Sequence, residues 1–329
     1  MYVIFFYMDT TDTYTSACFI SWHFLIALPQ HLTMQQLNSS NSSLTTPVST
    51  ESLIASSVLA VCFILGVPAN IAVMVRLAGW LKRDSFTPRL MLSLAVSDVL
   101  TLLSLPVWIW ARLHGWVFGL VLCKLLSYLV HLSLYSSILC VILMSVQRYI
   151  QVLHPQKWNK LGRKGKKILV SGIWILSGVL SSYALVQRTL TTDKEGRLRC
   201  SPHYHNNVER VATLIWEIIL FVGFFPTLAY FYFHLYRGVN NSAFYSSRSL
   251  TKLVTRIVAC FFIFFVPIQI SNIVIIIAVL LGNDNLLRSA NNGNKITVAL
   301  TFINSCVDPF LYVFSARALQ QQTDGTENT

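Results

Sequence analysis

The sequence predicts an all-α membrane protein: a bundle of seven transmembrane helices followed by a short amphipathic C-terminal helix. Hydrophobic residues make up 54% of the 329 residues and charged residues only 12%. A soluble domain carries roughly 25% charged residues. About seven long apolar runs follow one another between residues 52 and 315, and each is near the ~20 residues that cross a bilayer. Because backbone amides find no water in lipid, these runs are expected to be helical.

The spans divide the chain into three parts. We expect an extracellular N-terminal tail over residues 1–51, a seven-helix transmembrane domain over 52–315 and a short cytoplasmic tail over 316–329. The predicted spans are 52–78, 88–113, 120–153, 166–188, 208–237, 250–281 and 294–315.

The net charge of +12 is concentrated in alternate loops, which would all lie on one side of the membrane. Excess positive charge in short loops marks the cytoplasmic side. The sequence therefore predicts a multi-pass plasma-membrane protein with its N-terminus outside. We expect these loops to contact anionic membrane lipids, and we expect no nucleic-acid partner. The basic residues are Lys82, Arg83, Arg89, Arg148, Lys157, Lys160, Arg163, Lys164, Lys166, Lys167, Arg237, Arg248, Lys252 and Arg256.

The N-terminal tail carries two glycosylation motifs, at Asn38 and Asn41, in a stretch rich in Ser and Thr. Such motifs indicate an exposed extracellular segment. Residues 17–29 hold a short apolar run without a basic leader. This run is either a poor signal sequence or part of an upstream extension, residues 1–33, that precedes a more usual start at Met34. We favour the extension.

Two of the seven cysteines fall on the predicted outer side, where disulfide bonds persist. Cys123 begins the third span, and Cys200 lies in the loop between the fourth and fifth spans. A bond between them would pin that loop across the bundle and leave Cys18 unpaired. The cysteines within the spans are expected to pack as small apolar residues. They are Cys62, Cys140, Cys260 and Cys306.

Polar side chains at membrane depth are costly and indicate a function. Asp98 lies in the middle of the second span and Asp308 deep in the seventh. Oxygen ligands suit a hard cation such as sodium, so an allosteric sodium ion at Asp98 is the one candidate metal, and no other cofactor is expected. A hydrogen-bond network that joins helices is the alternative, and both can hold. The predicted network consists of Asn70, Asp98, Ser137, Asn304, Ser305 and Asp308.

The third span combines an outer cysteine with an inner cation. Cys123 and Arg148 stand 25 residues apart, which is about 37 Å of helix against a hydrocarbon core of roughly 30 Å. In the sixth span, Pro267 removes a backbone hydrogen bond and would kink the helix. This kink is either a hinge for the inner half of that helix or a proline that a membrane helix simply tolerates.

These landmarks, in this order, resemble the rhodopsin-like (class A) G-protein-coupled receptors over residues 52 to about 319. The resemblance is carried by Gly66, Asn70, Leu94, Ala95, Asp98, Trp116, Cys123, Arg148, Tyr149, Trp174, Cys200, Pro226, Pro267, Asp308, Pro309 and Tyr312. It implies that an extracellular agonist favours one of two packings of the bundle and that the inner face then receives a heterotrimeric G protein. The residues it implies for coupling and activation are Arg148, Tyr149, Phe265, Pro267, Asp308, Pro309 and Tyr312.

Within that family the chain is most similar to the leukotriene B4 receptors and other chemoattractant receptors, in the stretches 123–128, 133–137, 187–189 and 214–217. The resemblance implies a lipid agonist, leukotriene B4 or a related hydroxy-fatty acid. Such a ligand needs a cation at the mouth of the pocket and aromatic surface below it. The expected ligand-binding residues are Arg188 as first choice, with Lys124, Tyr128, Trp110, His203, Trp216 and Glu217.

Other functions remain as alternatives. A chemotactic-peptide receptor of the same fold would suit a peptide with a free carboxylate. A non-signalling scavenger or decoy is suggested by Gln147, Phe265 and His234, which depart from the family pattern; Gln147 stands where the family usually has an acid, so Arg148 lacks a charged neighbour. Retention of Arg148 and of the 308–312 motif argues against a decoy. An enzyme is not expected, because no cluster of nucleophiles or metal ligands lies at one depth.

Overall fold

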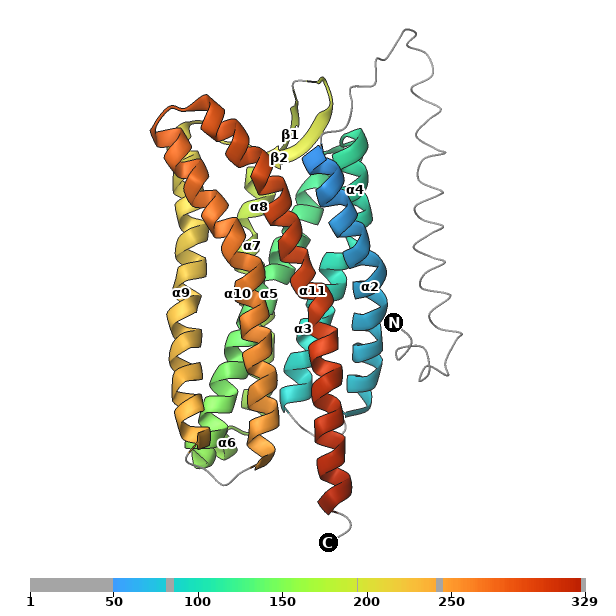
Figure 1. The fold of residues 1–329 in the computed structure, drawn as a ribbon, viewed down its shortest axis with the longest axis vertical. Coiled ribbons are helices and arrows are strands. Elements are labelled where there is room, and N and C mark those ends of the chain that lie inside the picture. The colour runs from blue at the N-terminus through green and yellow to red at the C-terminus, as the bar shows by residue number, and fades with distance from the viewer. Residues whose placement is uncertain (1–49, 81–85, 194, 241–244, 327–329) are drawn as a thin grey trace. The chain divides into compact units, whose positions relative to one another are not determined.

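A computed structural model describes residues 50–80, 86–193, 195–240 and 245–326 (Figure 1). All of them belong to one compact unit, Val48–Thr329. The predicted glycosylation sites Asn38 and Asn41, and Cys18, lie outside the described residues. For His234 and Tyr312 the helical backbone is described but the side chain is not.

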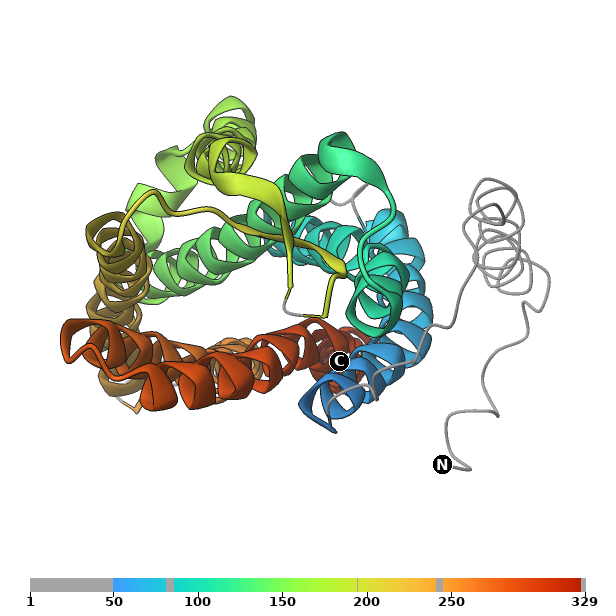
Figure 2. The ribbon, with the colours of Figure 1, turned by 90° about the horizontal axis from the view of Figure 1, so that it is seen from above.

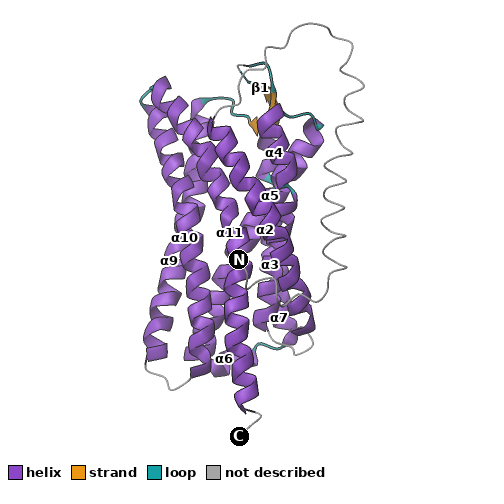
Figure 3. Ribbon diagram, turned by 45° about the vertical axis from the view of Figure 1, so that its right-hand side comes forward, coloured by secondary structure: helices purple, strands orange, loops and turns teal. Residues whose placement is uncertain are grey.

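Four of the predicted spans are single long helices whose bounds closely match the apolar runs (Figures 1 and 3). They are α2 (Thr50–Trp80), α5 (Gly119–Leu153), α9 (Asn207–Asn240) and α10 (Tyr245–Leu280). Pro68, Pro226 and Pro267 lie inside these helices without ending them, because neighbouring groups in a bundle can satisfy the carbonyl that a proline leaves free.

The second and fourth spans are each broken near the same end of the bundle. The second consists of α3 (Phe86–Leu103) and α4 (Leu105–His114). Pro106 causes this break, since it has no N–H and its ring clashes with the preceding turn. The fourth consists of α7 (Arg163–Ser181) and α8 (Tyr183–Gln187). At that break the Ser182 hydroxyl donates to the Val179 carbonyl at 2.7 Å, so a side-chain hydroxyl takes the place of a backbone N–H donor.

The seventh span is longer than the sequence predicted. Helix α11 runs from Asp284 to Thr326 without interruption, whereas we predicted a span over 294–315 and a separate short C-terminal helix. The prediction of a separate helix is wrong for a local reason. Residues 316–322 are Ala, Arg, Leu and Gln, which all favour helix, and no Gly or Pro ends the helix before Gly325.

The loop between the fourth and fifth spans forms a β-hairpin. Strands β1 (Arg188–Thr192) and β2 (Leu198–Pro202) pair antiparallel, with Leu190 opposite Cys200. Gly196 in the turn has φ +76°, a conformation that glycine adopts without strain. The hairpin extends across one end of the bundle (Figure 2), which we call the hairpin end. The opposite end, where α6 (Pro155–Lys160) lies, is the α6 end.

Five helical segments of the described part are long and apolar enough to cross a membrane. They are Thr50–Gly79, Phe86–His114, Gly119–Gln151, Arg163–Gln187 and Arg256–Leu280. The remaining two of the seven, α9 and α11, have 34 and 43 residues, and at 1.5 Å per residue each exceeds the thickness of a bilayer core.

The helices pack closely around a polar centre. Gly66 of α2 permits this close packing, because a Cβ there would lie 2.7 Å from Leu102 Cδ1 and 2.9 Å from Cys306 Sγ and would force these side chains to shift. Asn70, Asp98 and Asp308 are almost completely buried between α2, α3 and α11. Apolar side chains cover much of the outside, as a lipid-facing surface requires; Val61, for example, is 56% exposed.

Candidate functional site

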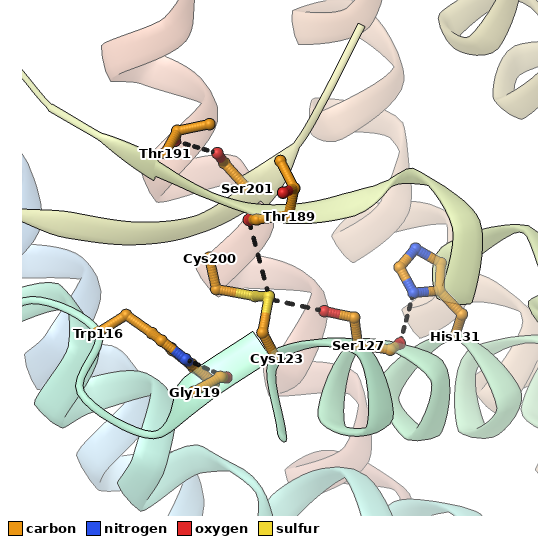
Figure 4. The surroundings of a disulfide bond; sticks show 9 residues. All are labelled: Trp116, Gly119, Cys123, Ser127, His131, Thr189, Thr191, Cys200 and Ser201. Atoms are coloured by element: carbon orange, nitrogen blue, oxygen red, sulfur yellow. Dashed lines mark hydrogen bonds between the residues drawn. A yellow bond between two sulfur atoms is a disulfide. The ribbon is translucent and has the colours of Figure 1, made fainter. Parts of the chain in front are cut away.

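The hairpin is fixed to the bundle by a disulfide bond between Cys123 of α5 and Cys200 of β2, as the sequence predicted (Figure 4). The Cα atoms of the two cysteines are 5.7 Å apart. A second attachment joins the hairpin to α4: the Arg199 guanidinium donates to the Ala111 carbonyl at 2.8 Å. The Trp116 backbone N–H also donates to the Leu198 carbonyl at 2.8 Å. The hairpin is therefore held at three points.

Asp193 organises the turn of the hairpin. Its carboxylate accepts from the Arg199 Nε at 2.9 Å and from the backbone N–H groups of Glu195 and Arg197 at 3.0 and 2.9 Å. Partial burial would raise the pKa of Asp193, but these donors outweigh it and hold the pKa below its usual value. The carboxylate therefore stays ionised and keeps Arg199 oriented towards α4.

Arg188, at the start of the hairpin, is the centre of a polar cluster. It begins β1, is half-buried, and interacts electrostatically with Tyr183, Tyr204 and Glu217. Glu217 of α9 accepts a hydrogen bond from Asn272 Nδ2 of α10 at 3.2 Å. Burial and the Glu217 carboxylate raise the pKa of Tyr204, although Arg188 opposes this shift. Residues from three sequence-distant segments thus meet around one cation.

Two residues of α5 extend this cluster, and sequence reasoning missed both. His131 contacts the Tyr183 ring edge-to-face, with centroids 5.2 Å apart. The Tyr135 and Tyr183 hydroxyls interact with each other. His131 and Tyr135 are four residues apart, which places them on the same side of a helix. This spacing is the signal that could have identified them. Asn272 gave no such signal, because α10 is apolar on most of its surface.

Several predicted ligand-binding residues have side-chain contacts with groups other than Arg188. Trp216 is 50% exposed, so it belongs to the outer surface of α9, as expected for a lipid-facing tryptophan. The Tyr128 hydroxyl packs against α7 at Gly178. His203 is exposed and contacts the His205 ring. Trp110 stacks on His114 at 4.2 Å.

Lys124 is half-buried next to the disulfide. Of the seven expected ligand-binding residues, the structure brings Arg188 and Glu217 together.

The polar centre contains more oxygen acceptors than donors. Asn70 Nδ2 donates to the carbonyls of Gly66 at 3.0 Å and Ser305 at 2.8 Å, and Asn304 Nδ2 donates to Asp308 Oδ2 at 3.2 Å. Five buried oxygens of this centre have no hydrogen-bond partner among the described residues. They are Asp98 Oδ1 and Oδ2, Asp308 Oδ1, Asn304 Oδ1 and Asn70 Oδ1.

This donor set fits a sodium ion, because the unpartnered oxygens are hard ligands and two of the groups are carboxyls. Asp98 and Asp308 interact electrostatically, and Ser305 lies beside Asp98. Ser137, the remaining member of the predicted network, is buried on α5. A neighbouring hydroxyl pair, Ser97 and Ser136 at 2.6 Å, was not foreseen.

We predict that sodium stabilises the folded protein through Asp98. Thermal unfolding of the solubilised protein is expected at a higher temperature in sodium chloride than in equimolar choline chloride, because a ligand that binds only the folded state stabilises it. Asp98→Asn should abolish the difference, since the amide removes the charge. Asp193→Asn, a carboxylate of the hairpin, is the control and should keep it. An equal sodium effect in the Asp98 variant would contradict a sodium site there.

At the α6 end, Arg148 and Gln147 share one partner. Arg148 Nη2 donates to Thr87 Oγ1 of α3 at 2.6 Å, and Gln147 Nε2 donates to the same oxygen at 2.7 Å. Arg148 is 7% exposed and Gln147 1%. A hydroxyl oxygen can accept two hydrogen bonds, so Thr87 is fully used as an acceptor. Arg148 therefore bonds to a neutral hydroxyl oxygen and has no charged neighbour at position 147.

We expect the wild-type protein to have higher basal activity than a Gln147→Asp variant. A carboxylate at this position would form a charge-assisted bond to Arg148, about twice as strong as a neutral one. The resemblance implies coupling to a G protein, so the measurement is agonist-free nucleotide exchange on that protein, divided by the number of molecules of this chain at the cell surface. Gln147→Asn, which has the size of Asp without its charge, is the control. Equal or lower basal exchange in the wild type would refute this prediction.

The other residues expected to act in activation lie along α5, α10 and α11. Tyr149 faces Tyr230 of α9, with ring centroids 6.3 Å apart. Phe265, two residues before Pro267, is buried and stacks at 4.2 Å on Phe261, one turn earlier in α10. Pro309 is buried next to Asp308 inside α11.

Comparison with known proteins adds independent information. Residues 69–312 match the model of the 7 transmembrane receptor (rhodopsin family). The chain is 30% identical over 277 residues to leukotriene B4 receptor 1 of Homo sapiens, covering 82% of this chain and 78% of that protein. It is 30% identical over 263 residues to C5a anaphylatoxin chemotactic receptor 1 of Rattus norvegicus, covering 78% and 74%.

A further relative is C-C chemokine receptor type 7 of Homo sapiens, 28% identical over 270 residues, covering 77% of this chain and 69% of that protein. The chain is thus similar to several receptors of the chemoattractant type, and its family consists of signalling receptors rather than enzymes. The family match spans most of the chain and agrees with the bundle of membrane-crossing helices. The protein is therefore a multi-pass membrane protein and a member of the rhodopsin family of seven-transmembrane, G-protein-coupled receptors.

Proposed function

We propose that the protein is a plasma-membrane receptor for a lipid chemoattractant, leukotriene B4 or a related hydroxy-fatty acid, and that it activates a heterotrimeric G protein. The N-terminus and the hairpin end face the outside, and the α6 end faces the cytoplasm. Exposed cations at the α6 end support this orientation, because positive charge in short loops marks the cytoplasmic side. They include Lys157, Lys160, Arg163, Lys164 and Lys167.

The observation that carries the proposal is the environment of Arg188. Its guanidinium lies among Tyr183, Tyr204 and Glu217, and it forms no hydrogen bond or salt bridge with the part of the chain that the structure describes. A guanidinium offers five donors in a planar fork that suits a carboxylate. Tyrosine rings beside it provide apolar surface for a hydrocarbon chain. This combination supports an agonist with an anionic or hydroxyl end and an apolar body.

Removal of the guanidinium tests the proposal. Cells that express the full chain are treated with leukotriene B4, and G-protein activation is recorded against dose. Arg188→Ala should shift the curve at least tenfold, because a hydrogen bond to a charged group contributes about 1.5–3 kcal/mol. Arg288→Ala, an exposed arginine at the same end of the bundle, is the matched control. An unchanged curve for Arg188→Ala would exclude this residue from agonist binding.

The second candidate is a receptor for a chemotactic peptide. Relatives named for C5a and for C-C chemokines, at 30% and 28% identity, favour it, and a peptide with a free terminal carboxylate would use Arg188 in the same way. A wild-type receptor that ignores leukotriene B4 and related hydroxy-fatty acids but answers such a peptide would replace the first proposal with the second. A scavenger that binds agonist without signalling is less supported, because Arg148 retains a buried position and a partner at the α6 end.

A further inference from the structure

The two ring nitrogens of His131, on α5, have different hydrogen-bonding roles. Its Nδ1 lies 2.7 Å from the Ser127 backbone carbonyl, one turn earlier in the helix (Figure 4). A carbonyl oxygen can only accept, so Nδ1 carries the proton and donates it. In the neutral imidazole the other nitrogen, Nε2, is then an acceptor. A cationic ring is unfavourable here, because the imidazole is half-buried and because Arg188, which carries a like charge, lies near it.

The acceptor on His131 is available to a ligand. Within the described residues, Nδ1 makes the ring's one hydrogen bond, and His131 is half-buried. The Tyr183 ring packs against the imidazole edge-to-face at 5.2 Å, which limits its rotation. The local geometry therefore presents a lone pair in a fixed direction next to the polar cluster around Arg188.

Donor and acceptor at neighbouring positions define the ligand chemistry. Arg188 supplies only donors, which suit a carboxylate or another acceptor. Nε2 of His131 supplies only a lone pair, which requires a ligand group that donates. In a hydroxy-fatty acid the carboxylate accepts and the hydroxyl groups donate, so such a molecule contains both complementary groups.

We propose that His131 Nε2 accepts a hydrogen bond from a hydroxyl group of the agonist and so determines selectivity for hydroxylated over non-hydroxylated fatty acids. This inference rests on the proposed lipid agonist and deepens it. A site built to bind a hydroxyl group discriminates strongly against the analogue without it, because its polar group is then left unpaired. An unpaired buried acceptor therefore lowers affinity by roughly five- to hundredfold.

The test uses the full chain in cells, with G-protein activation as the readout. The probes are leukotriene B4 and analogues in which one hydroxyl at a time is replaced by hydrogen or by fluorine. Fluorine can accept but cannot donate a hydrogen bond. For one hydroxyl position, the wild type is expected to lose at least tenfold in potency with both replacements. A ligand hydroxyl that accepts from Arg188 would instead tolerate fluorine better than hydrogen.

Variants assign the effect to His131. His131→Phe should respond about equally to leukotriene B4 and to the analogue that lacks the critical hydroxyl, because no acceptor remains to be satisfied. His131→Gln, which can present an amide oxygen, should retain part of the discrimination. His205→Phe, an exposed histidine at the hairpin end, is the control and should discriminate as the wild type does. Surface labelling checks expression, and the fluorine comparison in the wild type stands even where a variant fails to reach the surface.

Results that contradict the role of His131 differ from results that contradict the lipid agonist. Undiminished discrimination in His131→Phe, or full potency of every fluorinated analogue in the wild type, overturns the inference and leaves the lipid agonist in place. A wild-type receptor that is silent towards leukotriene B4 and all its analogues overturns the lipid function, and the inference with it.

Discussion

Thr87→Val is expected to raise agonist-free signalling about tenfold. The substitution keeps the volume of the side chain and removes the oxygen that accepts from Arg148 at 2.6 Å and from Gln147 at 2.7 Å. A hydrogen bond to a charged group contributes about 1.5–3 kcal/mol. If Arg148 leaves Thr87 when the receptor binds a G protein, this hydrogen bond stabilises only the inactive packing. Each 1.4 kcal/mol that is lost then raises the ratio of active to inactive receptor about tenfold.

The measurement is agonist-free nucleotide exchange on the G protein, normalised to receptors at the surface. Thr87→Ser keeps the hydroxyl and should behave as the wild type. Ser93→Ala removes another buried hydroxyl of α3, the acceptor for Trp174 Nε1 at 2.9 Å, and should leave basal exchange unchanged. Basal exchange in Thr87→Val that does not exceed the wild-type value would show that this contact does not restrain activation.

Loss of the disulfide is expected to have the largest effect on stability. Cys123 and Cys200 are 77 residues apart in the sequence. In the chain-entropy model a crosslink that closes a loop of this length stabilises the folded state by about 4.5 kcal/mol, although engineered crosslinks often contribute less. The double substitution Cys123→Ser and Cys200→Ser should therefore lower the unfolding temperature markedly and reduce the number of receptors at the cell surface.

Thermal unfolding of the solubilised receptor measures this change. Cys260→Ser, which alters a free thiol of α10, is the control. The remaining hairpin contacts, from Arg199 to the Ala111 carbonyl and from Trp116 to Leu198, should keep part of the hairpin in place. An unfolding temperature equal to that of the wild type would mean that these contacts alone hold the hairpin and that the crosslink adds nothing.

Much of the fold follows from local properties of the sequence. Helices α2, α5, α9 and α10 begin and end close to the limits of the apolar runs. Each apolar run in lipid satisfies its own backbone groups by forming a helix, whatever its neighbours are. Cys123 and Cys200 could be paired from their predicted side of the membrane. The hairpin of residues 188–202 was not predicted, since its strands are short and polar and depend on the disulfide and on α4.

The candidate site was predicted only in part, because a polar residue's role depends on which way its helix is turned. Trp216 and Glu217 are adjacent in sequence, yet Trp216 lies on the outer surface and Glu217 bonds to Asn272. Helices that are apolar on all sides do not reveal which face is buried. Sequence reasoning therefore included Trp216 with Glu217 and missed Asn272.

The sequence alone determined that the chain crosses the membrane with seven helices, because hydropathy is a sum over neighbouring residues. Its ordered motifs then carried the resemblance to the rhodopsin-like receptors. Only the tertiary structure decided which polar groups meet. Thr87 lies 61 residues from Arg148 in the chain, and Arg188 is joined to Glu217 only through the packing of helices and the hairpin. Those meetings depend on the rotation of each helix and on the break at Ser182, which no local pattern specifies.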